Sequence, residues 1–253
     1  MNQPVNLRAR SSYETEGWTV FRNVLRPSLR ISAVNWLYAA AARAGDDAAL
    51  EAEFEPEMPE RPLSVRKLRR LLWNDAPFWT GWLLESGIFE LGSSFITREP
   101  AVVFHAAFFK PGTIGSKVAF HQDQALWDND YPEAVSVWIA LSDSTERNGC
   151  MQLCPGSHRR ELIPHRSDTQ YPWHPYLDPV RDDLPAPKRI PMAQGDVLIW
   201  HRYLVHGSDP NVASEDRLGM VVVFANGASS SFKAKDVWRI ENSRTRDIAS
   251  IAG

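Results

Sequence analysis

The second half of this chain is a succession of short segments typical of β-strands, and this pattern limits the folds open to it. Segments rich in apolar and β-branched residues, separated by turns with proline and glycine, occupy residues 101–110, 118–123, 134–141, 150–154, 188–191, 197–201 and 218–225. Many short strands joined by such turns indicate an antiparallel sandwich or a barrel. The residues before Ala101 predict helices instead, so the expected fold class is mainly β with added helices.

Helical spacing of apolar residues marks the first hundred residues. The predicted helices cover residues 27–45, 64–72 and 75–87. Pro27 and Ser28 offer the start of the first helix. The second would carry Arg66, Arg69 and Arg70 on a solvated face. The acidic stretch 48–62 contains prolines and predicts an exposed loop.

A length of 253 residues fits one domain. We divide it into a flexible tail (1–12), a mostly helical part (13–100), a β-barrel core (101–226) and a C-terminal extension (227–253). Within the core, residues 158–188 form a long connection that contains several prolines and aromatic residues. Connections of this length are usually functional or disordered, and the aromatic residues favour function. We therefore expect a lid over the mouth of the core.

Composition excludes several classes of partner. The formal net charge is −3 with interspersed charges, so neither nucleic acid nor an anionic membrane is expected as a partner. The sequence has no apolar run of about 18 residues and no signal-peptide pattern, which predicts a cytoplasmic protein. Cys150 and Cys154 are too few for a disulfide framework and are expected to be buried. The oligomeric state stays open.

A histidine and an aspartate stand two residues apart in the segment V-A-F-H-Q-D-Q-A-L-W-D (118–128). In an extended chain, His121 and Asp123 point to the same side, and Gln122 points to the other. His206, in W-H-R-Y-L-V-H-G-S, is the candidate third ligand, with His201 as its competitor. Two histidines and one carboxylate make the facial triad of non-haem Fe(II) oxygenases. Taken alone, the pair also fits a surface hydrogen bond between two polar residues.

Further segments carry a resemblance to a known family. They are V-S-V-W-I-A-L-S-D (135–143), N-G-C-M-Q-L-C-P-G-S-H (148–158), G-D-V-L-I-W-H (195–201) and H-G-S-D-P-N (206–211), followed by Arg217. In this order they resemble the phytanoyl-CoA dioxygenase family of Fe(II)/2-oxoglutarate oxygenases, over roughly residues 102–224. The segment E-G-W-T-V-F-R-N-V-L near the N-terminus resembles the opening segment of that family.

The resemblance implies a double-stranded β-helix, a jelly-roll barrel with the N-terminal helices packed on one sheet. It also implies Fe(II), held by His121, Asp123 and His206 as the catalytic centre, with 2-oxoglutarate and O2 as co-substrates. Succinate, CO2 and a ferryl species would form, and the ferryl species would hydroxylate an unactivated C–H bond of a small molecule. Desaturation, cyclisation and epimerisation start from the same species and stay open, whereas the carboxylate of Asp123 disfavours halogenation.

Two residues are expected to bind 2-oxoglutarate. Arg217 lies eleven residues after His206, and its guanidinium can hold the far carboxylate by two parallel hydrogen bonds. Its alternative role is a salt bridge to Asp216 or Glu215. Trp138 stands where the family has a tryptophan beside the co-substrate, although a core tryptophan has the same pattern.

The expected substrate contacts are aromatic residues and one histidine. They are Trp127, Phe109, His105, Trp173 and Tyr176, although a hydrogen-bonded core histidine is the better interpretation of His105. These rings favour a partly apolar or ring-bearing substrate, such as a natural-product intermediate. No basic group that would bind a phosphate-rich coenzyme A is evident near the predicted mouth.

Two rival functions use the same residues. Two histidines and a carboxylate also hold zinc in hydrolytic enzymes, although such a site gives Arg217 no role. A metal-binding barrel that has lost catalysis is the other rival, but all four principal residues are present.

Overall fold

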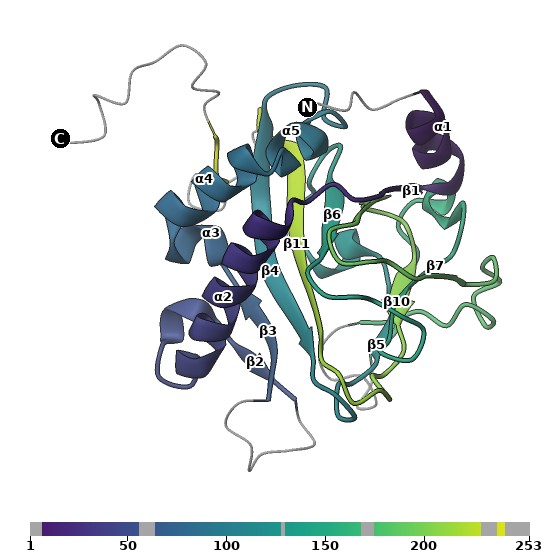
Figure 1. Cartoon of the computed structure of the whole chain (residues 1–253). Helices are drawn as coiled ribbons and strands as arrows, with labels where there is room; N and C mark the ends of the chain where they lie inside the picture. The colour runs from purple at the N-terminus through teal and green to yellow at the C-terminus, as the bar shows by residue number, and fades with distance from the viewer. Residues whose placement is uncertain (1–6, 56–63, 128–129, 168–174, 229–236, 241–253) are drawn as a thin grey trace.

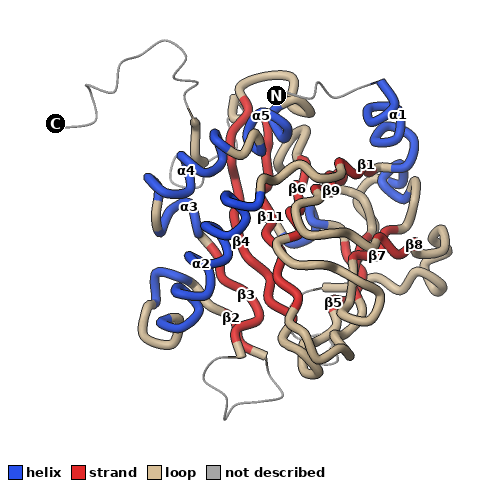
Figure 2. Tube along the Cα trace, in the orientation of Figure 1, coloured by secondary structure: helices blue, strands red, loops and turns tan. Residues whose placement is uncertain are grey.

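The computed structural model describes residues 7–55, 64–127, 130–167, 175–228 and 237–240. Two β-sheets form its centre, and helices cover the outer face of the larger sheet (Figure 1). Figure 2 shows the same arrangement: the helices between residues 27 and 93 lie on one side and the smaller sheet on the other, whereas the first helix (Leu7–Glu16) lies beside the strand that follows it. No helix in the described part of the chain is long and apolar enough to cross a membrane.

The larger sheet has seven strands among the described residues. Their order is β1 (Trp18–Phe21), β9 (Val197–His201), β6 (Val135–Ala140), β11 (Arg217–Asn226), β4 (Pro100–Lys110), β3 (Val65–Arg69) and β2 (Glu53–Phe54). The smaller sheet has the order β5 (Val118–His121), β10 (His206–Ser208), β7 (Met151–Leu153) and β8 (Lys188–Ile190). All pairings are antiparallel.

The helices come mainly from the first hundred residues. They are α1 (Leu7–Glu16), α2 (Pro27–Arg43), η1 (Ala48–Leu50), α3 (Leu71–Asn74), α4 (Ala76–Glu85), α5 (Ile88–Ser93), η2 (Asp123–Leu126) and η3 (Ser157–Arg160). Pro27 opens α2, where its missing N–H has no partner to lose. The Asp75 side chain caps α4 by accepting a hydrogen bond from the Phe78 N–H. Two of the three expected helices, 27–45 and 75–87, are confirmed.

The central strands of the larger sheet, β4, β6, β9 and β11, are mostly apolar on both faces because both faces are buried. On β11, Met220, Val222 and Phe224 pack with the helices, whereas Val221 and Val223 face the smaller sheet. This arrangement explains why the strands could be recognised as continuous apolar runs. The expected strands from 101 onward are confirmed; β1 and β10 were missed.

Three expectations about organisation are wrong. Residues 7–12 belong to helix α1 and are not a flexible tail. The stretch 64–72 contains strand β3 and the short helix α3 instead of one helix, because residues 67–69 pair with β4. Among the described residues the two sheets share no paired strand, so the expected barrel is not closed.

The expected exposed loop at 48–62 is also partly wrong. Leu50 is fully buried, and strand β2 extends the larger sheet. Residues 56–63 of this stretch lie outside the described residues. Both cysteines are free and buried, as expected.

Candidate metal centre

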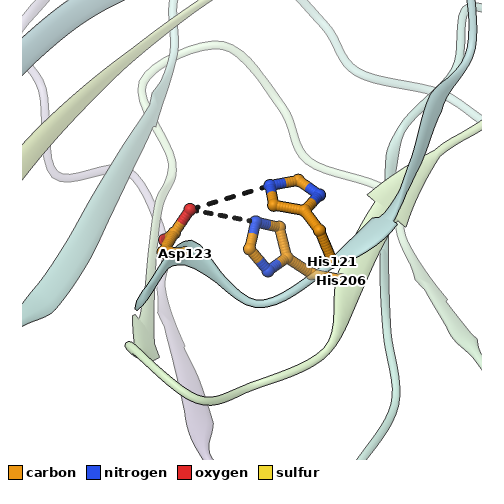
Figure 3. A group of neighbouring side chains, drawn as sticks. All are labelled: His121, Asp123 and His206. Atoms are coloured by element: carbon orange, nitrogen blue, oxygen red, sulfur yellow. Dashed lines mark ion pairs between the residues drawn. The ribbon is translucent and has the colours of Figure 1, made fainter. Parts of the chain in front are cut away.

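Three ligand-type side chains meet between the two sheets (Figure 3). His121 ends β5, and His206 begins β10 directly opposite it in the register of the two strands. Asp123 follows at the start of η2. One ligand atom from each residue lies within 4.8 Å of the others. The structure therefore brings together the three residues that the sequence proposed as metal ligands.

Each imidazole is oriented by the backbone of its own strand. Nδ1 of His121 lies 2.9 Å from the Ala119 carbonyl oxygen, and Nδ1 of His206 lies 2.9 Å from the Leu204 carbonyl oxygen. A carbonyl oxygen only accepts hydrogen bonds, so in both rings Nδ1 carries the proton. Nε2 then presents its lone pair toward the other ligands, which is the tautomer that binds a metal ion.

The carboxylate of Asp123 uses its two oxygens differently. Oδ1 lies 3.8 Å from Nε2 of His121 and 3.5 Å from Nε2 of His206. Oδ2 accepts hydrogen bonds from the Ser136 hydroxyl at 2.5 Å and from the Trp200 indole N–H at 2.8 Å. Oδ1 and the two Nε2 atoms thus form a set that fits a divalent ion of the first transition series.

Gln122 ties this centre to the connection at 158–188. Its fully buried amide donates to the carbonyl oxygens of Glu161 at 2.6 Å and Tyr203 at 2.7 Å, and accepts from the Ile163 N–H at 2.8 Å. The backbone N–H of Gln122 donates to Nε2 of His165 at 3.0 Å. As expected, Gln122 points away from the metal centre. It does so because its side chain and its backbone N–H find all these hydrogen-bond partners on the side opposite the metal centre.

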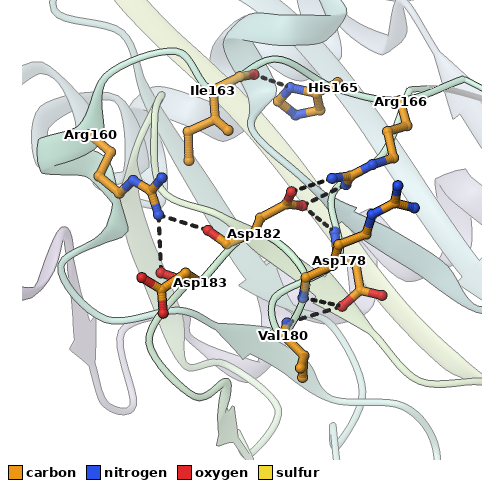
Figure 4. A network of polar contacts seen from close by, with 9 residues as sticks. Arg160, Ile163, His165, Arg166, Asp178, Val180, Asp182 and Asp183 are labelled. Atoms are coloured by element: carbon orange, nitrogen blue, oxygen red, sulfur yellow. Dashed lines mark hydrogen bonds and ion pairs between the residues drawn. The ribbon is translucent and has the colours of Figure 1, made fainter.

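The described part of the connection at 158–188 is ordered by its own polar contacts (Figure 4). Arg166 forms a two-pronged ion pair with Asp182 at 2.7 and 2.5 Å, and Arg160 donates to the carbonyl oxygens of residues 182 and 183. Leu177 bridges to Phe120 of β5. The segment therefore lies against the strand that carries His121, and its role as a lid stays a prediction.

A cavity of about 360 Å³ opens at the metal centre. Its wall includes all three ligand-type residues, Arg217, Trp138 and Trp127, and apolar side chains of β4, β7 and β11. Trp127 also lines a second cavity of about 280 Å³, which shares Arg69, Phe104 and Leu126 with the first. Trp127 therefore lies in the cavity wall, and its role as a substrate contact stays a prediction.

Arg217 is buried at this cavity and lies against an aromatic ring. Its guanidinium carbon is 4.6 Å from the centre of the Trp138 ring. One terminal nitrogen donates to the Gly149 carbonyl oxygen, and Nε has no hydrogen-bond partner. Burial lowers the pKa of Arg217 to about 10, which leaves it cationic at neutral pH. The alternative of a salt bridge to a neighbouring acidic residue is not found.

Gly219 makes this stacking sterically feasible. A Cβ atom at this position would lie 1.9 Å from Cζ2 of Trp138. The Trp138 ring therefore passes close to the β11 backbone at Gly219, beside Arg217, and does not belong to the helix-side core.

His105 and Phe109 do not line this cavity, so their expected placement as substrate contacts is wrong, and His105 instead takes the core position that the sequence favoured for it. Both point to the helix-covered face, where the His105 ring packs edge-on against Trp79 and the Phe109 ring against Tyr38. His105 only borders the second cavity. Strand alternation instead gives the cavity Phe104 and Phe108.

The aromatic residues of the connection have different outcomes. Trp173 lies outside the described residues. Tyr176 pairs through its backbone with Arg166, and among the described residues of this connection it is Pro175 that lines the cavity. Nothing in the cavity wall supports Tyr176 as a substrate contact.

Basic residues of β3 reach the cavity, contrary to the expectation that none stands near its mouth. Arg66, Lys67 and Arg69 line it together with Glu53. The Lys67 ammonium lies 5.2 Å from the centre of the Phe108 ring, and burial is the main cause of its lowered pKa. The helix predicted for 64–72 placed Arg66 and Arg69 on a solvated face, so their position at the cavity was not predicted.

His201 is not part of the metal centre. Its ring packs against His158 at 5.3 Å and Tyr203 at 5.4 Å, and its Nδ1 accepts from the Tyr203 N–H. Burial lowers the pKa of His201 to about 4. The choice of His206 over His201 as the third ligand agrees with this geometry.

The two facing sheets and the centre between them define a double-stranded β-helix with a candidate site for one metal ion, formed by two histidines and a carboxylate. The family model described as phytanoyl-CoA dioxygenase (PhyH) matches residues 13–219. The chain belongs to the phytanoyl-CoA dioxygenase family. The match includes the N-terminal segment that the sequence had related to this family.

The sequence of a curated relative supports this assignment. Phytanoyl-CoA dioxygenase 1 of Oryza sativa subsp. japonica is 31% identical over 193 residues, which cover 74% of this chain and 65% of that protein. The match thus spans slightly less than two thirds of this relative's length.

Two solved structures share the fold. EctD from S. alaskensis with 2-oxoglutarate and 5-hydroxyectoine has a TM-score of 0.73 at 16% identity, covering 92% of this chain and 82% of that one. The α-ketoglutarate-dependent carbocyclase SnoK from nogalamycin biosynthesis has a TM-score of 0.69 at 20% identity, covering 87% and 84%. At these identities the likeness shows the fold alone.

Proposed function

We propose that this chain is an Fe(II)/2-oxoglutarate-dependent dioxygenase that hydroxylates an unactivated C–H bond of a small organic molecule. The observation that carries the proposal is the convergence of His121, Asp123 and His206 on one point of a cavity that also contains Arg217. A hydrolytic metal site has no use for this buried cation.

The residues divide the work between metal, co-substrate and substrate. His121, Asp123 and His206 hold Fe(II) on one side and leave the opposite positions to ligands. Arg217, stacked on Trp138, binds the far carboxylate of 2-oxoglutarate. Bound iron would couple the conversion of 2-oxoglutarate and O2 into succinate and CO2 to oxidation of the substrate. The rings of Phe104, Phe108 and Trp127 exclude water from the reacting carbon.

Hydroxylation is our choice among the outcomes open to such a site. The presence of the Asp123 carboxylate disfavours halogenation, because it occupies the coordination position that a halide would need. The fold is compatible with other outcomes, since the neighbours include a structure described as a carbocyclase and another described as an epimerase. The aromatic rings in the cavity wall support a partly apolar or ring-bearing substrate, such as a natural-product intermediate.

Anaerobic titration tests the proposal first. Fe(II) added together with 2-oxoglutarate should produce a weak visible charge-transfer band, which a zinc site cannot produce. Admission of air should then release succinate, and a panel of candidate substrates should accelerate this release. A wild-type protein that binds Fe(II) but never converts 2-oxoglutarate would identify a metal-binding protein without catalysis.

A further inference from the structure

We propose that Ser136 and Trp200 are positioning residues that keep Asp123 a one-oxygen ligand of the metal ion. The proposal rests on the metal site of the proposed function. It assigns a role to two residues that do not themselves contact the ion.

The geometry assigns the two donors to one oxygen. Ser136 on β6 and Trp200 on β9 are direct partners in the antiparallel register, so their side chains point to the same face of the larger sheet. Both are almost completely inaccessible to solvent, at 0% and 2% exposure. Their hydroxyl and indole N–H both donate to Oδ2 of Asp123, at 2.5 and 2.8 Å.

The other oxygen faces the histidines. Oδ1 of Asp123 is the atom within 4 Å of both Nε2 atoms. Oδ2 has two lone-pair sites, and the two donors already use both, so a metal ion bound through Oδ2 would leave at least one buried donor without an acceptor, which is unfavourable. The two hydrogen bonds therefore favour binding through Oδ1 alone.

This matters because the carboxylate decides how many positions stay open. With one oxygen from Asp123 and one nitrogen from each histidine, half of an octahedral shell is available to ligands. A second oxygen from the same carboxylate would occupy one of the positions needed by 2-oxoglutarate or O2.

The donors also connect the two layers of the fold. His121 and His206 come from the smaller sheet, whereas Ser136 and Trp200 come from the larger one. Trp200 additionally packs its ring 4.8 Å from that of His206. The larger sheet thus fixes the orientation of a ligand set carried by the smaller sheet.

The test removes each donor and uses Co(II) as the probe, because its visible absorption reports the number of ligands without turnover. Ser136→Ala and Trp200→Phe each remove one donor. Trp18→Phe is the matched control: Trp18 pairs with Trp200 on the adjacent strand, and its indole N–H is buried without a hydrogen-bond partner. Ser136→Thr keeps the hydroxyl and serves as the conservative rescue.

We expect Ser136→Ala and Trp200→Phe to weaken Co(II) binding by about 10- to 100-fold. Their Co(II) spectra should also change shape, as the carboxylate gains freedom to bind through both oxygens. Trp18→Phe and Ser136→Thr should keep the wild-type affinity and spectrum. If Ser136→Ala does not fold, Trp200→Phe against Trp18→Phe decides the question alone.

Wild-type Co(II) affinity and an unchanged spectrum after loss of the Trp200 donor would overturn the proposal. Equal losses in Trp200→Phe and Trp18→Phe would overturn it as well, because they would indicate general loosening of the sheet. Neither result depends on 2-oxoglutarate turnover. Failure of the proposed function, by contrast, would appear in the wild type as absence of succinate.

Discussion

The two faces of the seven-stranded sheet carry different side chains, although the same strands supply both. Toward the helices, β6 and β11 present Val137, Ile139, Met220 and Phe224, which join the larger apolar cluster. Toward the smaller sheet, β6 and β11 present polar or cationic residues and a large ring. These are Ser136, Trp138 and Arg217.

Because of this difference, one face of each strand contributes mainly to stability and the other mainly to the candidate site. Buried polar groups on the cavity face have specific partners, such as Oδ2 of Asp123 for Ser136 and the Gly149 carbonyl oxygen for Arg217. On the helix face, by contrast, the buried His105 has no hydrogen-bond partner for its Nδ1. Substitutions on the helix face should change the free energy of unfolding, and substitutions at the cavity should change binding and turnover.

Asp123→Ala should give the largest effect. It removes the only carboxylate among the three ligand-type residues, so succinate formation should become undetectable while the fold persists. Succinate release under air, with circular dichroism as the control for folding, checks this. Turnover near the wild-type rate would place the metal ion elsewhere.

Arg217→Ala should give the second largest effect, and this effect should concern the binding of 2-oxoglutarate only. Loss of a buried, two-pronged charged contact typically raises the required ligand concentration by roughly 100-fold or more. The 2-oxoglutarate concentration at half-maximal rate should therefore rise, and Co(II) affinity should stay near wild type. Arg217→Lys keeps the charge but lacks the planar guanidinium, so its 2-oxoglutarate requirement should lie between those of the wild type and Arg217→Ala. An unchanged 2-oxoglutarate requirement in Arg217→Ala would contradict the assignment.

The metal centre could be predicted from the sequence because it depends on local geometry. His121 and Asp123 converge because Gln122 is extended between them, with φ −107° and ψ 134°. This follows from strand alternation alone. His206 was added from its sequence context, and the direct pairing of His206 with His121 gives the physical reason.

The faces of β4 could not be predicted in the same way. Its sequence A-V-V-F-H-A-A-F-F-K is apolar on both sides, so no alternation distinguishes His105 from Phe104. The register with β11 also shifts, since Val223 pairs with Phe104 and Phe224 with Val102. Similarly, V-R-K-L-R (65–69) fits helical spacing, and only its pairing with distant β4 makes it a strand. The roles of Ser136 and Trp200 as hydrogen-bond donors could not be predicted either, because they depend on the pairing of distant strands.

A smaller effect is expected from His105→Phe, through the pH dependence of stability. Burial lowers the pKa of His105 to about 3. Above its usual pKa of about 6.5, both folded and unfolded states are neutral. As the pH falls below this value, the unfolded chain binds a proton that the folded chain excludes, so stability is lost. At about pH 5 the loss amounts to about 2 kcal/mol.

His105→Phe should remove this contribution and keep a ring against Trp79. Urea unfolding at neutral and acidic pH measures it: the variant should lose less stability on acidification than the wild type. An identical pH dependence in both proteins would mean that His105 is protonated in the folded state. Succinate formation at neutral pH should not change, since the residue points away from the metal centre.

The smallest effect is expected from a comparison of two adjacent residues of β6. Ile139 is fully buried on the helix face, and Trp138 stacks on Arg217 on the other. Ile139→Val should lower the free energy of unfolding by about 0.5–1.5 kcal/mol and leave the 2-oxoglutarate requirement unchanged. Trp138→Leu should raise that requirement, because Arg217 loses the ring that orients it. Urea unfolding and 2-oxoglutarate titration of both variants check the pair. If Ile139→Val changed the 2-oxoglutarate requirement as much as Trp138→Leu, the two faces of the sheet would not be functionally separate.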